Sequence, residues 1–441
     1  MKPWGVTVIG GGILGTSVAY WLSRRYDDRI AVVEKEPQVA QHSSRRNTGI
    51  THRPFYLDPA KQHVFARSAQ TAYWMWKIYA KERHLPWNPV GTFEVATQEK
   101  QVARLETYYR WGQENGMTPS ELQLLTPEQV KQYEPHVQCH GAIWSKTDTA
   151  VDYGVFTNSL RADAERHGVK FVMGSEVKTI RIHGDVLDID LVDGSEPVKT
   201  RFLINCAGGR SIHIAHMLNV GRNYTDLNFR GEYWRVRDDQ THLANRCIYT
   251  VPRHPEFPFL DPHWIIRTDG HCEIGPNAVP VAGPYTYTGF FSNPVELIEK
   301  ILGPPIRNKL LLLFNAEFLN LSRQEWKSSI YKSVMAERAQ EFLPELKLEY
   351  LTTPGIAGIR SAVIDQNGSF IKEAIELPGP MSYHITNYNS PGATGAPAYA
   401  AWLVRKLESK GYLDHLKPKR DQSRRLWDFN AVCDAIDTPP A

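Results

Sequence analysis

Three glycines and one acid near the start of the chain have the spacing of a dinucleotide-binding site. Gly10, Gly12 and Gly15 stand between the apolar run Val6–Ile9 and a segment with apolar residues at helical spacing. Gly10 permits a tight turn, Gly12 lets the backbone approach a pyrophosphate, and Gly15 lets the helix pack on the strand. Glu34 ends a second apolar run, where its carboxylate can accept hydrogen bonds from a ribose and repels the 2′-phosphate of NADP. The motif alone does not separate NAD from FAD.

The bulk composition predicts two packed domains. The chain has 441 residues, 42% of them hydrophobic and 22% charged, and a formal net charge of +3, so nothing favours nucleic acid as a partner. The five cysteines include no Cys-x-x-Cys pair, which argues against a metal site and suits a reducing compartment. The first strand begins by Val6, and no apolar run approaches the ~20 residues of a membrane span. We therefore expect a cytoplasmic protein.

Segments far apart in the chain are expected to build the nucleotide domain. The long polar loop after Glu34 contains Ser43–Arg53 and is suited to wrap a cofactor, although a plain basic surface loop is the alternative. The buried strand Phe202–Cys206 ends in small residues, and Asn387–Gly395 opens a helix whose positive end can stabilise a reduced flavin. Flavoproteins build their domain from such separated segments, whereas simple NAD dehydrogenases usually complete theirs in one piece. FAD is therefore the predicted cofactor.

The predicted fold class is α/β, with a Rossmann-type FAD-binding domain and a second α+β substrate domain that contains an antiparallel sheet. We assign residues 1–89, 150–225 and 351–410 to the FAD-binding domain, 90–149 and 226–350 to the substrate domain, and 411–441 to a C-terminal tail. The residues expected at the FAD site are Gly10, Gly12, Ile13, Leu14, Gly15, Glu34, Lys35, Ser44, Arg45, Asn47, Thr48, Val177, Ala207, Gly208, Ser390, Pro391, Gly392, Ala393 and Thr394.

Further local motifs are more specific than the glycine turn. They are Asn47–His52, Phe229–Tyr233, Gly275–Val279, Gly358–Arg360 followed by Asp365–Gly368, and His384 leading into Ser390–Thr394. From the first strand to about Val404 the chain resembles the L-2-hydroxyglutarate dehydrogenase/oxidase family, within the D-amino-acid oxidase superfamily. The resemblance implies an FAD-dependent enzyme that oxidises the CH–OH group of an anionic 2-hydroxy acid to the 2-oxo acid by hydride transfer to flavin.

Oxidation of a hydroxy acid needs a base for the hydroxyl proton and cations for the acid group. His52 is the predicted base, because an imidazole near its ordinary pKa is partly neutral at cytoplasmic pH and can accept a proton. His384 is the competing base. Arg360 would hold a carboxylate with its planar fork. Arg230 is either a further substrate ligand or a structural partner of a nearby glutamate.

Arg53-Pro54 stands where the family has Ala-Gly. A guanidinium beside the base would provide a second anion clamp, so we predict a substrate with a strong anionic group at its far end. The late motif Gly392–Ala398 lies part way towards FAD-dependent glycerol-3-phosphate dehydrogenases. Oxidation of glycerol-3-phosphate to dihydroxyacetone phosphate is therefore the alternative function, and nucleotide binding without turnover is a weaker one. The sequence does not predict whether quinone, oxygen or a carrier protein accepts the electrons.

The C-terminal tail suggests a peripheral membrane or partner contact. It carries aromatic residues that could anchor at an interface, Tyr412 and Trp427. Each basic residue near an anionic surface contributes about 1 kcal/mol. The alternative is a helix packed on its own domain. The basic residues of this region are Lys406, Lys410, Lys417, Lys419, Arg420 and Arg424.

Overall fold

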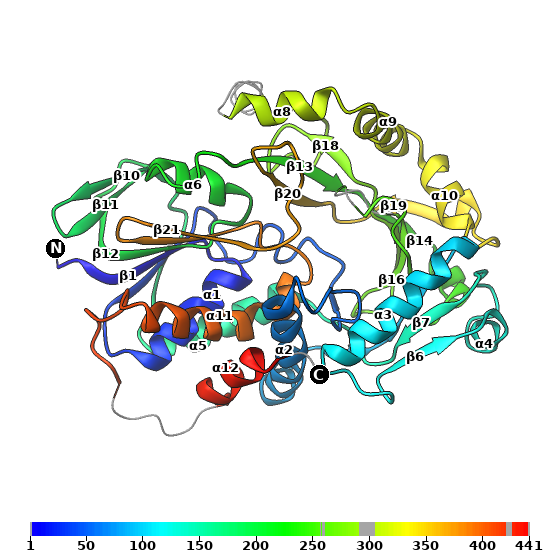
Figure 1. The fold of residues 1–441 in the computed structure, drawn as a ribbon, viewed down its shortest axis with the longest axis horizontal. Coiled ribbons are helices and arrows are strands. Elements are labelled where there is room, and N and C mark those ends of the chain that lie inside the picture. Colours follow the sequence, from blue (N-terminus) through cyan, green and yellow to red (C-terminus); the bar gives the residue numbers. More distant parts are fainter. Residues whose placement is uncertain (1, 256, 258–260, 291–304, 420–425, 440–441) are drawn as a thin grey trace.

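Two bodies of different architecture lie side by side in the computed structural model (Figure 1). One is built around a mostly parallel sheet with helices on both faces, and the other around a curved, mostly antiparallel sheet. The chain crosses between them several times. The structure describes residues 2–255, 257, 261–290, 305–419 and 426–439.

The glycine motif lies at the centre of the first body. β1 (Trp4–Ile9) leads through the glycines into α1 (Ile13–Arg25), and β2 (Ile30–Val33) returns beside β1 in parallel. β12 (Val198–Asn205) pairs in parallel with the other edge of β1, and β22 (Ser382–Thr386) pairs in parallel with β12. Strands from the beginning, middle and end of the chain therefore form one sheet, as the sequence predicts.

Helices cover both faces of this sheet, which explains why its central strands are continuous apolar runs. α1 packs with α5 and α11 below the sheet, and α6 lies above it (Figure 1). The remaining elements of this body are β9 (Lys170–Val172), β10 (Val177–His183), β11 (Val186–Leu191), β21 (Ile375–Gly379), α2 (His63–Arg83), α5 (Tyr153–Arg166), α6 (Ser211–Met217), α11 (Gly392–Ser409) and α12 (Phe429–Asp437).

The second body contains an eight-stranded sheet in the order β19-β14-β17-β16-β15-β5-β7-β6 and a three-stranded sheet in the order β18-β13-β20. Neighbouring strands are antiparallel except for β5 and β15. The predicted fold class is thus confirmed. The strands are β5 (Thr92–Val95), β6 (Leu122–Leu125), β7 (Ala142–Ser145), β13 (Thr225–Gly231), β14 (Trp234–Val236), β15 (Cys247–Thr250), β16 (His263–Ile266), β17 (Cys272–Gly275), β18 (Val279–Val281), β19 (Leu351–Pro354) and β20 (Gly358–Ile364).

Two helices on the outside of the second body, α4 and α9, begin at side-chain caps. At α4, the Thr126 side chain accepts a hydrogen bond from Gln129 N, and Pro127 occupies the first turn, as its sequence predicts. The helices of this body are α3 (Val102–Glu114), α4 (Pro127–Tyr133), α8 (Ile306–Leu313), α9 (Ala316–Ile330) and α10 (Lys332–Gln340). A small sheet of β3 (Ile50–Thr51), β4 (Asn88–Pro89) and β8 (Thr149–Ala150) lies at the junction of the bodies.

One domain boundary differs from the prediction. β19 and β20 pair with β14 and β13, so they belong to the second body, although the sequence assigned residues 351–410 to the FAD-binding domain. Their partners are more than a hundred residues earlier in the chain, and such distant pairing has no local signature. The third FAD-binding segment begins instead at β21, which pairs with β22.

The C-terminal tail packs on the first body. The Trp427 side chain is 4% exposed and donates a hydrogen bond to Met75 O, and Tyr412 stacks on Phe202. The two aromatic residues proposed as interfacial anchors therefore face inward, and that part of the prediction is wrong. Lys406 pairs with Glu376, whereas Arg420 and Arg424 lie outside the described residues.

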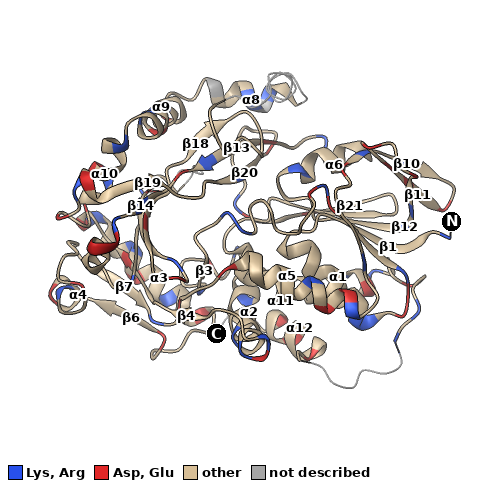
Figure 2. Cartoon of the chain, turned by 180° about the vertical axis from the view of Figure 1, so that it is seen from behind, with Lys and Arg blue, Asp and Glu red and all other residues tan. Residues whose placement is uncertain are grey.

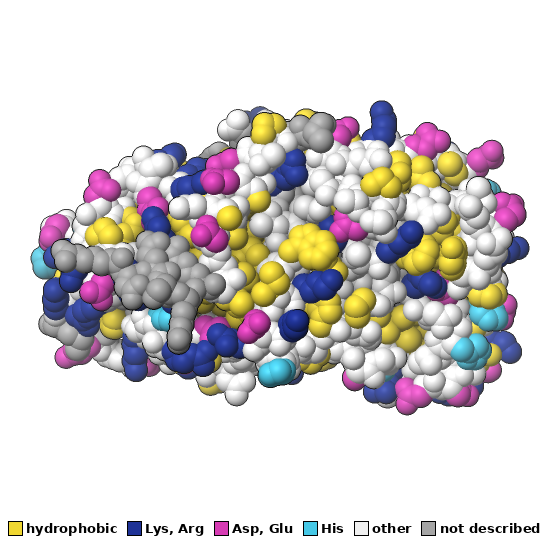
Figure 3. Space-filling model, turned by 90° about the horizontal axis from the view of Figure 1, so that it is seen from below, with side chains coloured by type: hydrophobic (Ala, Val, Ile, Leu, Met, Phe, Trp, Pro, Cys, Tyr) yellow, Lys and Arg dark blue, Asp and Glu magenta, His cyan; other side chains and the backbone are white. Residues whose placement is uncertain are grey.

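Charges of both signs are distributed over the helices and outer loops (Figure 2). The face seen in Figure 3 likewise shows lysine and arginine interspersed with acidic and hydrophobic side chains. Within the described part of the chain, no helix has the length and apolar character needed to cross a bilayer.

Candidate active site

A cavity of about 570 Å³ lies between the two bodies. It reaches from the start of α1 to the start of α11, and its walls contain residues of all three predicted FAD-binding segments. Of the predicted cofactor residues, all but two line this cavity: Gly10, Gly12, Ile13, Leu14, Glu34, Lys35, Ser44, Asn47, Thr48, Val177, Ala207, Gly208, Ser390, Pro391, Gly392, Ala393 and Thr394. Gly15 and Arg45 do not.

The glycine turn has the conformation that its sequence requires. Gly10 adopts a φ of +106°, and a side chain there would collide with the Cys206 carbonyl on the neighbouring strand β12. A side chain at Gly15 would collide with the Gly10 carbonyl. Gly15 therefore lies beneath the turn as a packing residue rather than in the cavity wall.

Glu34 is fixed at the end of β2 beside the turn. Its carboxylate accepts hydrogen bonds from Gly11 N at 2.6 Å and Glu36 N at 2.8 Å. Burial raises the pKa of this carboxyl group. Each carboxylate oxygen can accept more than one hydrogen bond, so the group retains acceptor capacity on the cavity side for ribose hydroxyls. Lys35 lies beside it, with its ammonium 3.6 Å from the centre of the Tyr285 ring.

The segment 41–49, here called the flavin loop, is held from two sides. Ser44 Oγ accepts a hydrogen bond from Ile13 N at 2.9 Å, which fixes the loop to the start of α1. On the other side, Ser43 Oγ donates to Ile359 O at 3.1 Å, and the Arg46 guanidinium donates to Ala357 O at 3.2 Å. Arg46 also lines the cavity, although the sequence did not select it.

Arg45, which the sequence placed at the cofactor, is exposed and does not line the cavity. Its side chain lies against Gly154 at the start of α5. Consecutive residues of this loop point in different directions, and the composition of the loop does not reveal which of them face inward.

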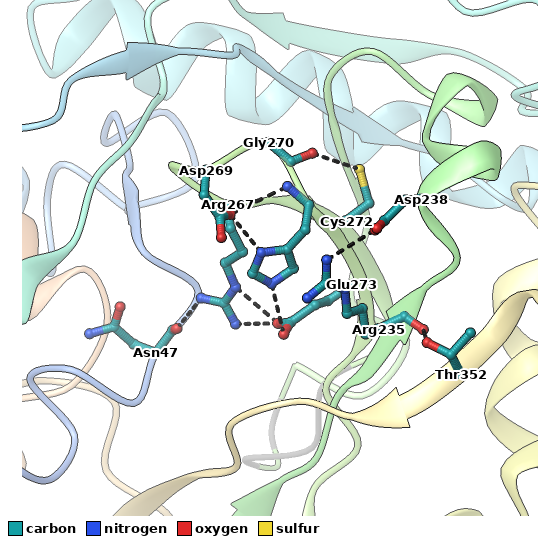
Figure 4. Close-up of polar contacts among 10 residues, drawn as sticks. Asn47, Arg235, Asp238, Arg267, Asp269, Gly270, Cys272, Glu273 and Thr352 are labelled. Carbon is teal, nitrogen blue, oxygen red and sulfur yellow. Dashed lines mark hydrogen bonds and ion pairs between the residues drawn. The ribbon is translucent and has the colours of Figure 1, made fainter.

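The second body is tied to the flavin loop by a buried ion pair (Figure 4). Arg267, after β16, donates to Asn47 O at 2.7 Å and also pairs with Glu273 on β17 at 2.5 Å. His271 contacts the same carboxylate at 3.3 Å. The Asn47 side chain bridges its own loop, donating to Ser43 O and Ser44 O. This network fixes the loop that leads into His52.

His52 lines the cavity and is paired with a buried aspartate. His52 Nδ1 lies 3.0 Å from Asp148 Oδ2, and Asp148 is fully buried. When the neutral ring donates its Nδ1–H to this carboxylate, Nε2 is its acceptor nitrogen. Thr394 Oγ1, at the start of α11, accepts a hydrogen bond from His52 N at 3.1 Å.

Asp148 is a candidate functional residue that the sequence did not reveal. β3 pairs antiparallel with β8, with Thr51 opposite Thr149, so the residue after β3 faces the residue before β8. Asp148 Oδ1 accepts further hydrogen bonds from Ser145 Oγ at 2.5 Å and Arg53 N at 3.2 Å. The two partners of the pair are 96 residues apart, and only the strand pairing brings them together.

Arg360, on β20, also lines the cavity. Its Nε is buried without a hydrogen-bond partner, and no carboxylate of the described residues pairs with its guanidinium. Burial lowers the pKa of this group. A buried cation without a protein anion is costly, so an anion bound in the cavity would stabilise it.

The prediction that Arg53 binds the far end of the substrate is wrong. Its side chain is fully buried and does not line the cavity. The guanidinium pairs with Glu121 at 2.9 Å, donates to Thr147 and Gln70, and lies 4.3 Å from the centre of the Tyr73 ring. Because the protein itself supplies an anion and acceptors, Arg53 has a structural role behind His52.

Two further predicted residues lie outside the cavity. His384 is buried in β22, where Asn205 Nδ2 and Ser382 Oγ occupy its two ring nitrogens, both at 3.0 Å. Burial lowers its pKa to about 4. Arg230 pairs with Glu232 at 2.7 Å. His384 as the competing base and Arg230 as a substrate ligand are therefore both wrong.

Side chains of the second body close the cavity around His52. Glu94, Tyr249 and His263 come from the adjacent strands β5, β15 and β16, and His263 stacks on Tyr249 at 4.0 Å between ring centres. Burial lowers the pKa of His263 to about 3, so this ring is neutral. We call this end of the cavity the substrate chamber; the residues that define it are His52, Tyr56, Glu94, Tyr108, Tyr249, His263 and Arg360.

Comparison with known proteins identifies the family. A family model described as FAD dependent oxidoreductase matches residues 5–406. The chain belongs to this family. It is 28% identical over 415 residues to a mitochondrial L-2-hydroxyglutarate dehydrogenase of Caenorhabditis elegans, covering 92% of this chain and 93% of that protein. It is also 28% identical over 406 residues to an L-2-hydroxyglutarate dehydrogenase of Escherichia coli K12, covering 91% and 92% of the two chains.

Solved structures show the same fold. An L-alpha-glycerophosphate oxidase from Mycoplasma pneumoniae with FAD bound superimposes with a TM-score of 0.70 at 20% identity, covering 96% of this chain and 98% of that one. A glycine oxidase from Bacillus cereus does so with a TM-score of 0.65 at 21% identity, covering 96% and 100%. At these identities the likeness concerns the fold. The predicted resemblance to the L-2-hydroxyglutarate dehydrogenases is confirmed by the sequence matches.

FAD is the cofactor of this enzyme family, and the residues of the cavity fit it. The cavity connects a glycine turn at the start of α1, where the N-cap residue Gly12 has no side chain, with a carboxylate at the end of β2; the first is suited to a pyrophosphate and the second to a ribose. At its other end the start of α11 adjoins His52. When bound, FAD would supply the acceptor for the hydride of the substrate.

Proposed function

We propose that this enzyme oxidises the CH–OH group of an anionic 2-hydroxy acid, with L-2-hydroxyglutarate as the first substrate to test. The observation that carries the proposal is the presence, in one chamber, of a base held by a buried carboxylate and of an arginine whose buried Nε has no hydrogen-bond partner. The names of the relatives support the choice of substrate.

His52 Nε2 would accept the proton of the 2-hydroxyl. Asp148 holds the ring through Nδ1 and stabilises the positive charge that the ring gains. Removal of this proton would favour release of the hydride from the carbon, for which bound FAD would supply the acceptor. Asp148 therefore positions the base and neutralises it, without touching the substrate.

Arg360 would hold the carboxylate next to the oxidised carbon. Two parallel N–H groups match the two oxygens of a carboxylate, and a dry site strengthens the pair. The arginine thereby orients the substrate with its hydroxyl towards His52. Tyr56 also lines the cavity and adds a hydroxyl group to its wall.

The glycerol-3-phosphate alternative is supported by likeness of fold alone, and no side-chain contact favours it. Nucleotide binding without turnover, the weaker alternative, is not supported by membership of an oxidoreductase family. The cytoplasmic location and the identity of the electron acceptor stay predictions from the sequence.

The test is anaerobic reduction of the bound FAD by candidate substrates, monitored as the loss of visible flavin absorbance. L-2-hydroxyglutarate should bleach the flavin rapidly, whereas its D-enantiomer and glycerol-3-phosphate should not. Arg360→Lys should weaken the apparent binding of the substrate, measured from how the reduction rate depends on substrate concentration. The expected loss is about 1.5–3 kcal/mol, the range of a hydrogen bond to a charged group. Arg235→Lys, at a partly exposed surface ion pair with Asp238, is the matched control and should leave reduction unchanged.

Rapid bleaching by glycerol-3-phosphate and none by 2-hydroxy acids would transfer the function to the alternative. Equal reduction of the Arg360→Lys variant and the native enzyme at every substrate concentration would remove Arg360 from the substrate site.

A further inference from the structure

The substrate chamber contains one acid that proton abstraction does not use. Glu94, on β5, lines the cavity and is 7% exposed. Among the described residues, no hydrogen-bond donor and no cation pairs with its carboxyl group. A buried polar group without a partner is costly, so this side chain is suited to a ligand.

The register of β5 explains why Glu94 faces the chamber. Side chains alternate along a strand, and the flanking residues Phe93 and Val95 belong to the hydrophobic core on the other face of the sheet. Glu94 stands opposite Tyr249 on β15, which also lines the chamber. The strand register therefore places the side chain of residue 94 in the chamber wall.

Resting on the proposed function, we propose that Glu94 determines specificity for the end of the substrate remote from the oxidised carbon. As a neutral carboxyl group, it donates a hydrogen bond to the far carboxylate of the 2-hydroxy acid. This is the position for which the sequence nominated Arg53, whose guanidinium is committed to Glu121.

The surroundings keep Glu94 neutral near pH 7. Burial, reinforced by the charge of Asp148, raises its pKa to about 8. Asp148, just before β8, is the charged group that acts on it. The tyrosines and the histidine that line the chamber from the packed elements are uncharged near pH 7: Tyr56 from the loop after His52, Tyr108 from α3, and Tyr249 and His263 from β15 and β16. His52 lies beside Tyr249.

A neutral carboxyl group donates one O–H bond, and its bond to a carboxylate is short and strong. Once ionised, the same group repels a carboxylate. Glu94 and Arg360 line the same cavity from different sheets of the second body, with Tyr56 also in its wall. A substrate with carboxylates at both ends can therefore be held at one end by Arg360 and at the other by Glu94.

The experiment compares two substrates of the same shape in the FAD-loaded enzyme. L-2-hydroxyglutarate carries a carboxylate at the far end, and L-2-hydroxyglutaramate carries an uncharged amide there. Second-order rate constants for anaerobic flavin reduction are measured between pH 6 and pH 10. Their ratio cancels the titration of His52, because both substrates use the same base.

In the native enzyme, the preference for the dicarboxylate should fall about tenfold per pH unit above the pKa of Glu94, as expected for a single ionisation. Glu94→Gln keeps a neutral donor, so its ratio should be independent of pH. Glu94→Leu removes the donor and should lower the rate constant for L-2-hydroxyglutarate roughly 10- to 100-fold. Glu99→Gln, an exposed acid-to-amide change in the same region, is the control and should reproduce the native profile.

If both substrates reduce the native enzyme and the ratio of their rate constants does not change with pH, the assignment of Glu94 is overturned and the proposed function stays intact. A rise in the dicarboxylate preference of Glu94→Gln well above the native value at pH 6 would also overturn it, because Glu94 would then act as an acceptor. Reduction by neither substrate would overturn the proposed function, and this inference with it.

Discussion

Arg360 and Arg53 were both predicted to bind the substrate, and the structure gives them opposite surroundings. Arg360 lines the chamber with a buried Nε that has no partner, whereas Arg53 lies behind His52 and is satisfied by Glu121, Thr147 and Gln70. The difference indicates that an arginine inside a protein is available to a ligand where no protein anion already pairs with it. Burial and residue type alone do not distinguish the two cases.

The largest expected effect is a loss of catalytic rate in a variant that keeps the native fold. His52→Gln removes the base, and flavin reduction at saturating substrate should slow by roughly 10²- to 10⁴-fold, because a positioned base contributes about that much. The FAD content and the absorption spectrum should stay native. His384→Gln is the paired variant, and it should reduce its flavin at the native rate. The reverse result would return the role of base to His384.

The two arginines themselves should separate stability from activity. Arg53→Met leaves Glu121 without its cation, and loss of one partner of a buried ion pair costs about 3–5 kcal/mol of unfolding free energy. Arg360→Met breaks no ion pair among the described residues, so its unfolding free energy should be nearly native while substrate-dependent reduction is lost. Denaturant unfolding and anaerobic reduction on the same preparations make the comparison. Loss of activity without loss of stability in Arg53→Met would restore its predicted role at the substrate.

The smallest effect concerns pH. The pKa of His384 is lowered to about 4 in the fold, from an ordinary value near 6.5. Its neutral form is the one that the fold accepts, so its contribution is complete above about pH 6.5 and is lost as the pH falls towards 4. The loss is on the order of 3 kcal/mol for this group. His384→Gln should flatten the pH dependence of unfolding in this range, although His263 adds a similar slope. An unchanged slope would show that His384 is charged in the folded protein.

Local motifs were sufficient for the nucleotide end of the cavity. The glycine turn needs particular backbone conformations at Gly10 and close packing at Gly15, and these requirements act within a few residues of the chain. The position of Glu34 beside the turn follows from the lengths of the helix and the strand that separate it from the glycines. The strand, the turn and the helix could therefore be predicted from the sequence, as could the use of separated segments and the choice of FAD.

The substrate chamber depended on strand pairing between distant segments. Asp148 meets His52 because β3 pairs with β8, and Glu94 faces inward because of the register of β5 beside β15. Arg53 was assigned wrongly because its neighbour in sequence, His52, faces the cavity while its own side chain turns towards Glu121. A sequence specifies residue types, but the direction of a side chain and the charge of its neighbours arise only when segments far apart in the chain pack together. For this reason the cofactor and the class of reaction were decided by the sequence alone, and the tertiary structure decided which charged residues can meet the substrate.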